Sequence, residues 1–141
     1  MNTFNFPEAN VWLALLWNRH ADSERARAWF EQVDEEQFFF CRFTQITVLR
    51  LLTSEWVMGS DTKSLAEAWG LWDRIWADER VDLLAEPDDL EKDFRWRSRL
   101  TERSSKVWVD SYLLAFAAVA GLKFITFERG LQGRGAEVVV I

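Results

Sequence analysis

Short apolar segments alternate with longer segments of helical periodicity along the chain, and this alternation limits the possible folds more than any other feature. The strand-like segments are residues 3–7, 38–41, 81–84, 123–127 and 137–141. Strands that alternate with helices in this way pair in parallel. The sequence therefore predicts an α/β fold with a doubly wound, mainly parallel central sheet flanked by helices. In such sheets, ligands bind at the carboxyl ends of the strands.

Helical periodicity fills most of the intervals between these strands. The expected helices cover residues 9–17, 22–33, 44–56, 62–77, 86–100 and 108–121. In the third of them, Thr44 is the predicted N-cap. The apolar spacing predicts that this helix turns Ile46, Leu49, Leu52 and Trp56 toward the core.

Length and composition favour one globular domain over residues 1–141. Of these 141 residues, 49% are hydrophobic and 15% aromatic, which suits a core of large side chains. The single cysteine, Cys41, cannot form an internal disulfide and fits a reducing, cytoplasmic setting. No apolar run approaches the roughly 20 residues that cross a bilayer, and the N-terminus has no signal-peptide pattern. We therefore expect no membrane association.

The net charge of −6 narrows the ways in which this chain can bind nucleic acid. Charge-driven binding over the whole surface is disfavoured, because it depends on many cations releasing counterions from phosphates. Any nucleic acid would need a local site, such as one organised by a metal ion.

Three acidic residues stand where a doubly wound sheet gathers its ligands. Glu8 follows the first strand, Glu128 follows the strand at 123–127, and Asp110 lies in the first turn of the helix between 108 and 121. Clustered carboxylates repel one another unless they are protonated or bridged by a cation, and oxygen ligands suit Mg²⁺ or Mn²⁺. Such a site suits phosphodiester hydrolysis, in which metal activates water and stabilises charge on the phosphate. Each acid also has a structural interpretation: two as carboxylates near helix N-termini and Glu128 as a solvated strand end.

Four segments carry a more specific signal. They are PEANVWLALLWNRHADSERARAWF at 7–30, CRFTQITVLRLLT at 41–53, WVDSYLLAFAAVAGL at 108–122 and FITFERGL at 124–131. In this order they resemble the PIN-domain ribonucleases of the VapC toxin type, and the resemblance extends over nearly the whole chain. The match is strongest in the helix that contains Asp110.

This resemblance implies a PIN fold, a divalent metal bound by acids, RNA cleavage and neutralisation by a cognate antitoxin of the VapB type. Asp110 falls on a matching Asp of the family, whereas Glu8 and Glu128 stand where the family usually has Asp. Glu8, Asp110 and Glu128 are therefore the predicted catalytic residues and ligands of Mg²⁺ or Mn²⁺. The acid that many PIN domains place on the third helix is absent, and that stretch offers Gln45 and Arg50 instead.

Five further residues are predicted to support the acids, and all but Gln45 have a structural alternative. Asn10 orients Glu8 or forms a local hydrogen bond. Gln45 contacts a metal-bound water or an RNA phosphate, and Thr126 contacts such a water or only favours the strand. Arg50 lies on an apolar helix face, where an inward guanidinium needs a carboxylate partner, or it contacts RNA. Arg129 steers phosphate or is an ordinary surface residue.

Two functions of different class remain open. The first is a metal-dependent endoribonuclease that acts on RNA as the toxin of a toxin–antitoxin pair and forms a homodimer. The second is a PIN-fold protein with weak or lost nuclease activity, retained for binding an antitoxin or another partner. Trp69, Trp72 and Trp76 form a stripe at helical spacing, which we interpret as core or as a partner or dimer surface. A nucleotide-binding protein is disfavoured because no Gly-rich phosphate loop follows a strand.

Overall fold

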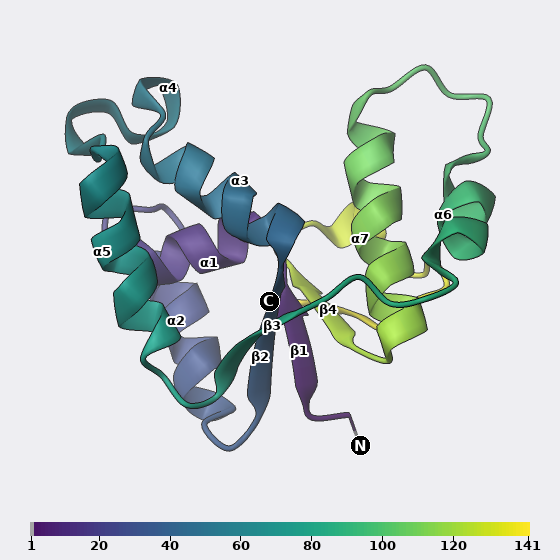
Figure 1. Cartoon of the computed structure of the whole chain (residues 1–141), viewed down its shortest axis with the longest axis horizontal. Coiled ribbons are helices and arrows are strands. Elements are labelled where there is room, and N and C mark those ends of the chain that lie inside the picture. Colours follow the sequence, from purple (N-terminus) through teal and green to yellow (C-terminus); the bar gives the residue numbers. More distant parts are fainter. Residues whose placement is uncertain (1) are drawn as a thin grey trace.

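A single parallel sheet forms the centre of the computed structural model, which describes residues 2–141 (Figure 1). Its strands are β1 (Phe4–Pro7), β2 (Gln37–Cys41), β3 (Val81–Leu84), β4 (Lys123–Thr126) and β5 (Val138–Val140). They lie in the order β3-β2-β1-β4-β5, and every neighbouring pair is parallel. The chain starts in the middle strand and extends the sheet first to one side and then to the other. This order confirms the predicted doubly wound sheet and places its switch point between β1 and β4.

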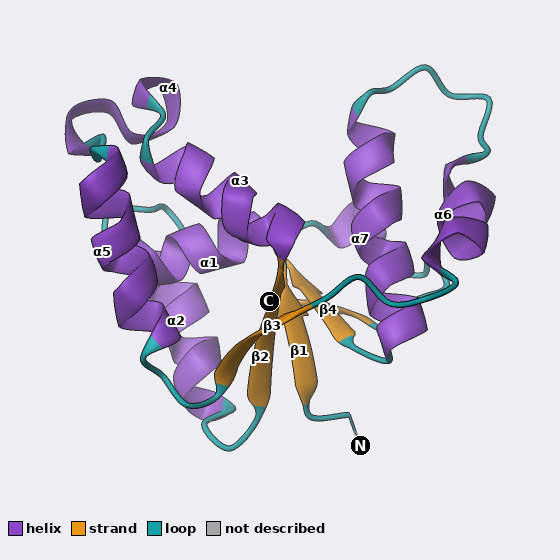
Figure 2. Ribbon diagram, viewed as in Figure 1, coloured by secondary structure: helices purple, strands orange, loops and turns teal. Residues whose placement is uncertain are grey.

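Helices cover both faces of this sheet (Figure 2). They are α1 (Ala9–Leu16), α2 (Ser23–Gln32), α3 (Arg42–Leu52), α4 (Glu55–Met58), α5 (Leu65–Trp76), α6 (Leu90–Ser98) and α7 (Lys106–Ala120), with short 3₁₀ helices η1 (Gly59–Asp61) and η2 (Arg129–Leu131). Figure 2 shows α6 and α7 on one side of the strands and α1, α2, α3 and α5 on the other. In the part of the chain that the structure describes, no helix has both the length and the apolar character needed to cross a membrane.

Each sheet face has its own aromatic core. On the α1 side, the buried Trp12 stacks on Phe40 with ring centroids 4.1 Å apart. On the α7 side, Phe6 stacks on Phe116 with centroids 4.9 Å apart. Phe40 belongs to one core, whereas its neighbour Phe39 packs against the other. This confirms the prediction that the strand at 38–41 is buried on both faces.

Helix α3 begins three residues earlier than the sequence suggests. Its N-cap is Cys41, and the Thr44 hydroxyl reaches back to accept a hydrogen bond from the Cys41 backbone N–H at 2.9 Å. The buried face consists of Thr44, Gln45, Val48 and Leu52, at helical spacing. Of the predicted inner residues, Ile46 is half exposed. The prediction of the inner face was therefore wrong except at Leu52 and the half-buried Leu49.

The tryptophan stripe on α5 is divided between core and surface. Trp72 is buried and packs between Phe40 and Trp76, with centroids 4.6 Å and 5.5 Å away. Trp69 and Trp76 remain partly exposed at the edges of this contact. The middle of the stripe therefore belongs to the core, and Trp56, with a side chain 97% exposed, is the aromatic residue most open to solvent.

Candidate active site

The switch point of the sheet brings Glu8 next to the end of β4. Glu8 directly follows β1, and its backbone N–H donates to the Ile125 carbonyl at 2.9 Å, which continues the β1–β4 ladder by one residue. One carboxylate oxygen, Oε1, accepts a long hydrogen bond of 3.4 Å from the Phe127 backbone N–H. Sheet register therefore fixes both the backbone and the side chain of Glu8.

Thr126 links the first acid to the last. It is buried as the final residue of β4, and its Oγ1 accepts a hydrogen bond of 3.0 Å from the Glu128 backbone N–H. The same side chain lies close enough to the Glu8 carboxylate to lower its pKa. Thr126 thus fixes the backbone at Glu128 and favours the charged form of Glu8, in addition to favouring the strand.

Burial makes the charge of Glu8 costly. It raises the pKa of Glu8 from 4.5 to about 7, the nearby Thr126 side chain and the hydrogen bond from Phe127 oppose the rise, and the negative charges of Glu128 and Asp110 add to it. The three carboxylates therefore stand close enough to repel one another. At neutral pH, Glu8 is about half protonated, and a cation among the acids would favour its ionised form.

A lysine from α7 contacts the other two acids. Lys106 Nζ donates to both carboxylate oxygens of Glu128, at 2.9 and 2.8 Å, and lies 4.0 Å from Asp110 Oδ2. Lys106 and Asp110 are four residues apart on one helix, so they share a face. The hydrogen bond with Glu128 raises the pKa of Lys106. Burial raises the pKa of Asp110, and the charge of Lys106 opposes that rise.

The acids suit a hard cation by chemistry, although Lys106 now lies against two of them. Carboxylate oxygens are the usual protein ligands of Mg²⁺ and Mn²⁺. Within residues 2–141, no three Asp, Glu, His or Cys side chains are arranged to hold one metal ion. The ammonium of Lys106 already acts as a cation between Glu128 and Asp110, and its side chain is 62% exposed. A metal shared by all three carboxylates therefore requires Lys106 to swing outward, which its exposure permits.

Asp110 lies one turn further into its helix than the sequence suggests. Helix α7 starts at Lys106, so Asp110 is in the second turn, and the first turn contains no acid. A favourable interaction with the helix dipole falls off within the first turn. The structural interpretation of Asp110 as a first-turn carboxylate was therefore wrong.

Two of the predicted supporting residues bond to partners other than the acids. Asn10 Oδ1 lies 2.9 Å from His20 Nε2, and His20 Nδ1 accepts a hydrogen bond from the Asp22 backbone N–H. The imidazole therefore carries its proton on Nε2 and donates it to Asn10. Gln45 is buried at the start of α3 and accepts a hydrogen bond from Arg42. Of the two predicted roles of Asn10, the structure contains the local hydrogen bond, made with His20.

The two predicted arginines are both exposed. Arg50 points outward from α3 and forms no ion pair within the described chain, so the expectation of an inward guanidinium with a carboxylate partner was wrong. The reason is helix phase: Arg50 is two residues from the buried Val48 and two from the buried Leu52, which places it on the other side of the helix. Arg129 lies in η2, directly after Glu128, with its side chain at the surface.

Two basic residues near the acids were missed from the sequence. Lys106 contacts Glu128 and Asp110, and the charge of Arg134 also opposes the rise in the pKa of Asp110 that burial causes. The spacing of four residues between Lys106 and Asp110 on a predicted helix was a usable signal. Arg134 follows no periodic pattern, because it lies in the loop between η2 and β5.

Comparison with known proteins agrees with this architecture. The PIN domain family matches residues 6–136. Ribonuclease VapC41 of Mycobacterium tuberculosis is 37% identical over 135 residues, covering 91% of each chain, and ribonuclease VapC44 of the same organism is 31% identical over 137 residues, covering 88% of this chain and 85% of VapC44. The crystal structure of M. tuberculosis VapC20, a Sarcin-Ricin loop cleaving toxin, has a TM-score of 0.68 at 18% identity, with 93% and 95% of the two chains covered. The chain therefore belongs to the PIN domain family, among the VapC ribonucleases.

Proposed function

We propose that this VapC-family ribonuclease hydrolyses RNA phosphodiester bonds with the help of Mg²⁺ or Mn²⁺ held by Glu8, Asp110 and Glu128. The observation that carries the proposal is the convergence of three carboxylates at the switch point of the sheet, two of them around a lysine ammonium. When bound, the divalent ion would activate water and stabilise charge on the phosphate. The chain would act as one PIN-like domain.

The chain's own residues would prepare this site in three ways. The Phe127 N–H orients Glu8, so the innermost carboxylate needs little reorganisation. Glu8 would lose its proton as a cation binds, because its pKa near 7 depends on burial and on the repulsion of the other acids. Lys106 would leave Glu128 and Asp110 and remain close enough at the start of α7 to attract a phosphate.

The partners that we propose follow from the family. An antitoxin of the VapB type would cover the acid site, and an Arg or Lys from it would suit the carboxylates. Toxin and antitoxin would act in the cytoplasm, and the toxin would form a homodimer. Exposed apolar side chains on α4 and α5, among them Trp56, Leu65 and Trp69, support the presence of a protein partner.

A cleavage assay tests the function directly. The purified protein is incubated with a panel of structured RNAs that includes a Sarcin-Ricin loop, the target named for VapC20. We expect cleavage with Mn²⁺, none with EDTA and none by Asp110→Asn. Asp73→Asn is the matched control, since Asp73 is an exposed acid on α5 without an ion pair in the described chain, and it should cleave as the wild type does.

A second function is supported by one observation. Glu8 and Glu128 have longer side chains than the Asp usual in the family, and Lys106 neutralises Glu128 within the chain. A protein that keeps these contacts would bind an antitoxin without cleaving RNA. Folded protein that binds its antitoxin and leaves the whole RNA panel intact with Mg²⁺ and with Mn²⁺ would support this function and exclude the first.

A further inference from the structure

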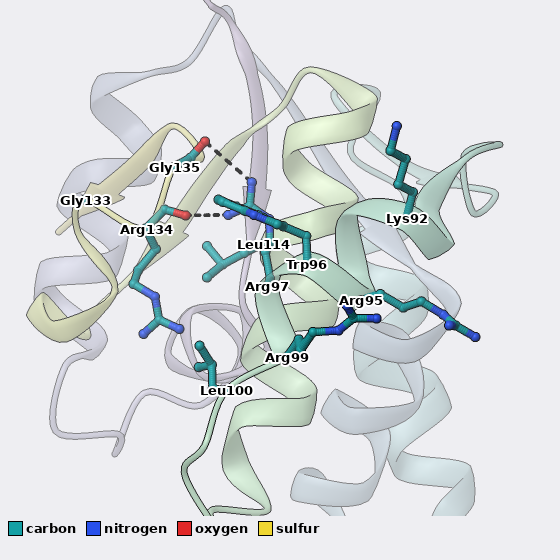
Figure 3. Close-up of a pocket in the computed structure, with 10 residues that line it drawn as sticks. All are labelled: Lys92, Arg95, Trp96, Arg97, Arg99, Leu100, Leu114, Gly133, Arg134 and Gly135. Atoms are coloured by element: carbon teal, nitrogen blue, oxygen red, sulfur yellow. Dashed lines mark hydrogen bonds between the residues drawn. The ribbon is translucent and has the colours of Figure 1, made fainter.

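A basic cavity lies beside the acid site, on the α7 side of the sheet. Its volume is about 810 Å³, and helix α6 and the loop at 133–135 form its walls (Figure 3). The lining includes five cationic residues and no acidic one, which is unexpected in a chain with a net charge of −6. The cationic residues are Lys92, Arg95, Arg97, Arg99 and Arg134.

Two of these cations have structural partners. Arg95 pairs with Glu91 across one helical turn, and Arg97 pairs with Asp93 in the same way. Arg97 is also buried and donates to the backbone carbonyls of Arg134 and Gly135, the contacts drawn as dashed lines in Figure 3. It therefore fixes the loop against α6 and is not available to a ligand.

The other three cations are available. Lys92, Arg99 and Arg134 form no ion pair with any described residue. In Figure 3 the Arg134 side chain runs from the loop toward Leu100, while its backbone carbonyl faces Arg97. The contact that fixes the loop thus leaves the Arg134 guanidinium free.

The cavity is joined to the acid site through α7. The buried Ser111, next to Asp110 in the chain, donates a hydrogen bond of 3.4 Å to the Arg97 carbonyl on α6. A strand of RNA with its scissile phosphate at the acids would therefore have its neighbouring phosphates within reach of this cavity.

The chemistry of the lining fits RNA in two respects. Guanidinium and ammonium groups bind phosphate oxygens, and Arg in particular matches their geometry. Trp96 presents an indole that is 69% exposed at the same cavity, and bases stack on such side chains. We propose that the cavity between α6 and the loop at 133–135 binds the RNA backbone next to the cleaved bond, through Lys92, Arg99 and Arg134. This inference rests on the proposed ribonuclease function.

A second basic cavity provides a matched control. It has a volume of about 460 Å³, lies on the opposite side of the sheet, and is lined by Arg19, Arg27, Lys63 and Arg74 together with Asp61. Asp61 accepts hydrogen bonds from Trp17 and Arg19, so this cavity contains its own negative charge. None of its lining residues contacts Glu8, Asp110 or Glu128.

The test measures RNA binding without cleavage. A fluorescent single-stranded RNA is titrated in EDTA with the wild type, with Lys92→Ala/Arg99→Ala/Arg134→Ala, and with the control Arg27→Ala/Lys63→Ala/Arg74→Ala. Each lost phosphate contact lowers the salt slope by about 0.7, which is about fivefold in affinity at 0.1 M salt. We expect the first triple variant to bind about 100-fold more weakly with a slope smaller by about 2, and the control to keep the wild-type slope.

Two further measurements make the result specific. Trp96→Ala should weaken binding about fivefold or more, whereas Trp69→Ala on α5 should not. Circular dichroism should be the same in all variants, which shows that each of them is folded. Equal losses in the two triple variants, or no loss in either, would overturn the proposal.

The remaining outcomes separate this inference from the function on which it rests. If the first triple variant binds RNA normally but fails to bind the antitoxin, the cavity serves that partner and the proposal is wrong. Selective loss of RNA binding in a protein that never cleaves RNA would support the binding site and contradict the hydrolytic function.

Discussion

The inner and outer halves of the acid site differ in what holds their charges in place. In the inner half, Glu8 is mostly buried, is fixed by the Phe127 backbone N–H and lies close to Thr126. In the outer half, Asp110 and Glu128 face an exposed lysine that bridges them. The inner charge is costly but well positioned, whereas the two outer charges are partly balanced by Lys106 and are free to exchange partners. Binding of a divalent ion would have to ionise Glu8 and release Glu128 and Asp110 from Lys106.

Asp110→Asn should have the largest effect on activity. It keeps the size of the side chain and removes a proposed metal ligand from the outer half. We expect RNA cleavage with Mn²⁺ to fall at least about 100-fold, the usual scale for loss of one group that stabilises charge in a transition state. The free energy of unfolding should change by less than about 1 kcal/mol, since the contact with the exposed Lys106 is long. Activity near the wild-type level would remove Asp110 from the site.

Glu8→Gln should have the largest effect on stability and its pH dependence. The pKa of Glu8 is about 7 in the folded chain against 4.5 ordinarily, so the folded state holds its proton more tightly than the unfolded state does. The native state therefore loses stability as pH rises from 4.5 to 7, by up to about 3 kcal/mol, and loses no more above that range. Urea unfolding between pH 4 and 8 should show this loss in the wild type and not in Glu8→Gln. Parallel pH profiles for the two proteins would contradict the burial of a titrating Glu8.

Thr126→Val tests whether Thr126 connects Glu8 in the inner half with Glu128 in the outer half. The change keeps the shape of the buried side chain and removes the hydroxyl that contacts Glu8 and the Glu128 backbone. We expect the free energy of unfolding to fall by about 1 to 2 kcal/mol and the pKa of Glu8 to rise above 7. Thr47→Val is the control, because the Thr47 hydroxyl bonds only to the Phe43 carbonyl within α3. Equal effects of the two substitutions would argue against a special role for Thr126.

Lys106→Met should have the smallest effect on stability but a clear effect on metal affinity. An exposed ion pair contributes less than about 1 kcal/mol, so the unfolding curve should hardly move. Because Glu128 and Asp110 lose a competing cation, Mn²⁺ should bind several-fold more tightly by calorimetry. Lys63→Met is the control on the other side of the sheet. Unchanged or weaker Mn²⁺ binding would show that Lys106 does not compete for these acids.

The parts of the site that depend on sheet topology could be predicted from the sequence. Alternating periodicities indicated a doubly wound sheet, and its switch point placed Glu8 beside the end of β4. Strand ends are specified by local patterns, and parallel pairing brings them to one edge. The resemblance to PIN domains indicated the same three acids, Glu8, Asp110 and Glu128.

The parts of the site that depend on helix phase and on the reach of long side chains could not be predicted from the sequence. Whether Arg50 faces the core depends on which face of α3 packs inward, and the face that contains Val48 and Leu52 leaves Arg50 on the other side. Asn10 had two possible partners, and only the turn that brings His20 close decides between them. Arg134 approaches Asp110 through a loop that buried Arg97 holds, a contact across 37 residues that no periodicity indicates.

Calorimetric titration of the wild type with Mn²⁺ near pH 7 shows whether Glu8, Asp110 and Glu128 form a metal site. We expect saturable binding with proton release, seen as a heat that depends on the buffer, because Glu8 is about half protonated at this pH. Asp110→Asn should abolish this binding, and Glu8→Gln should abolish the proton release. No binding at millimolar Mn²⁺, or binding that neither substitution changes, would contradict a metal site made of Glu8, Asp110 and Glu128.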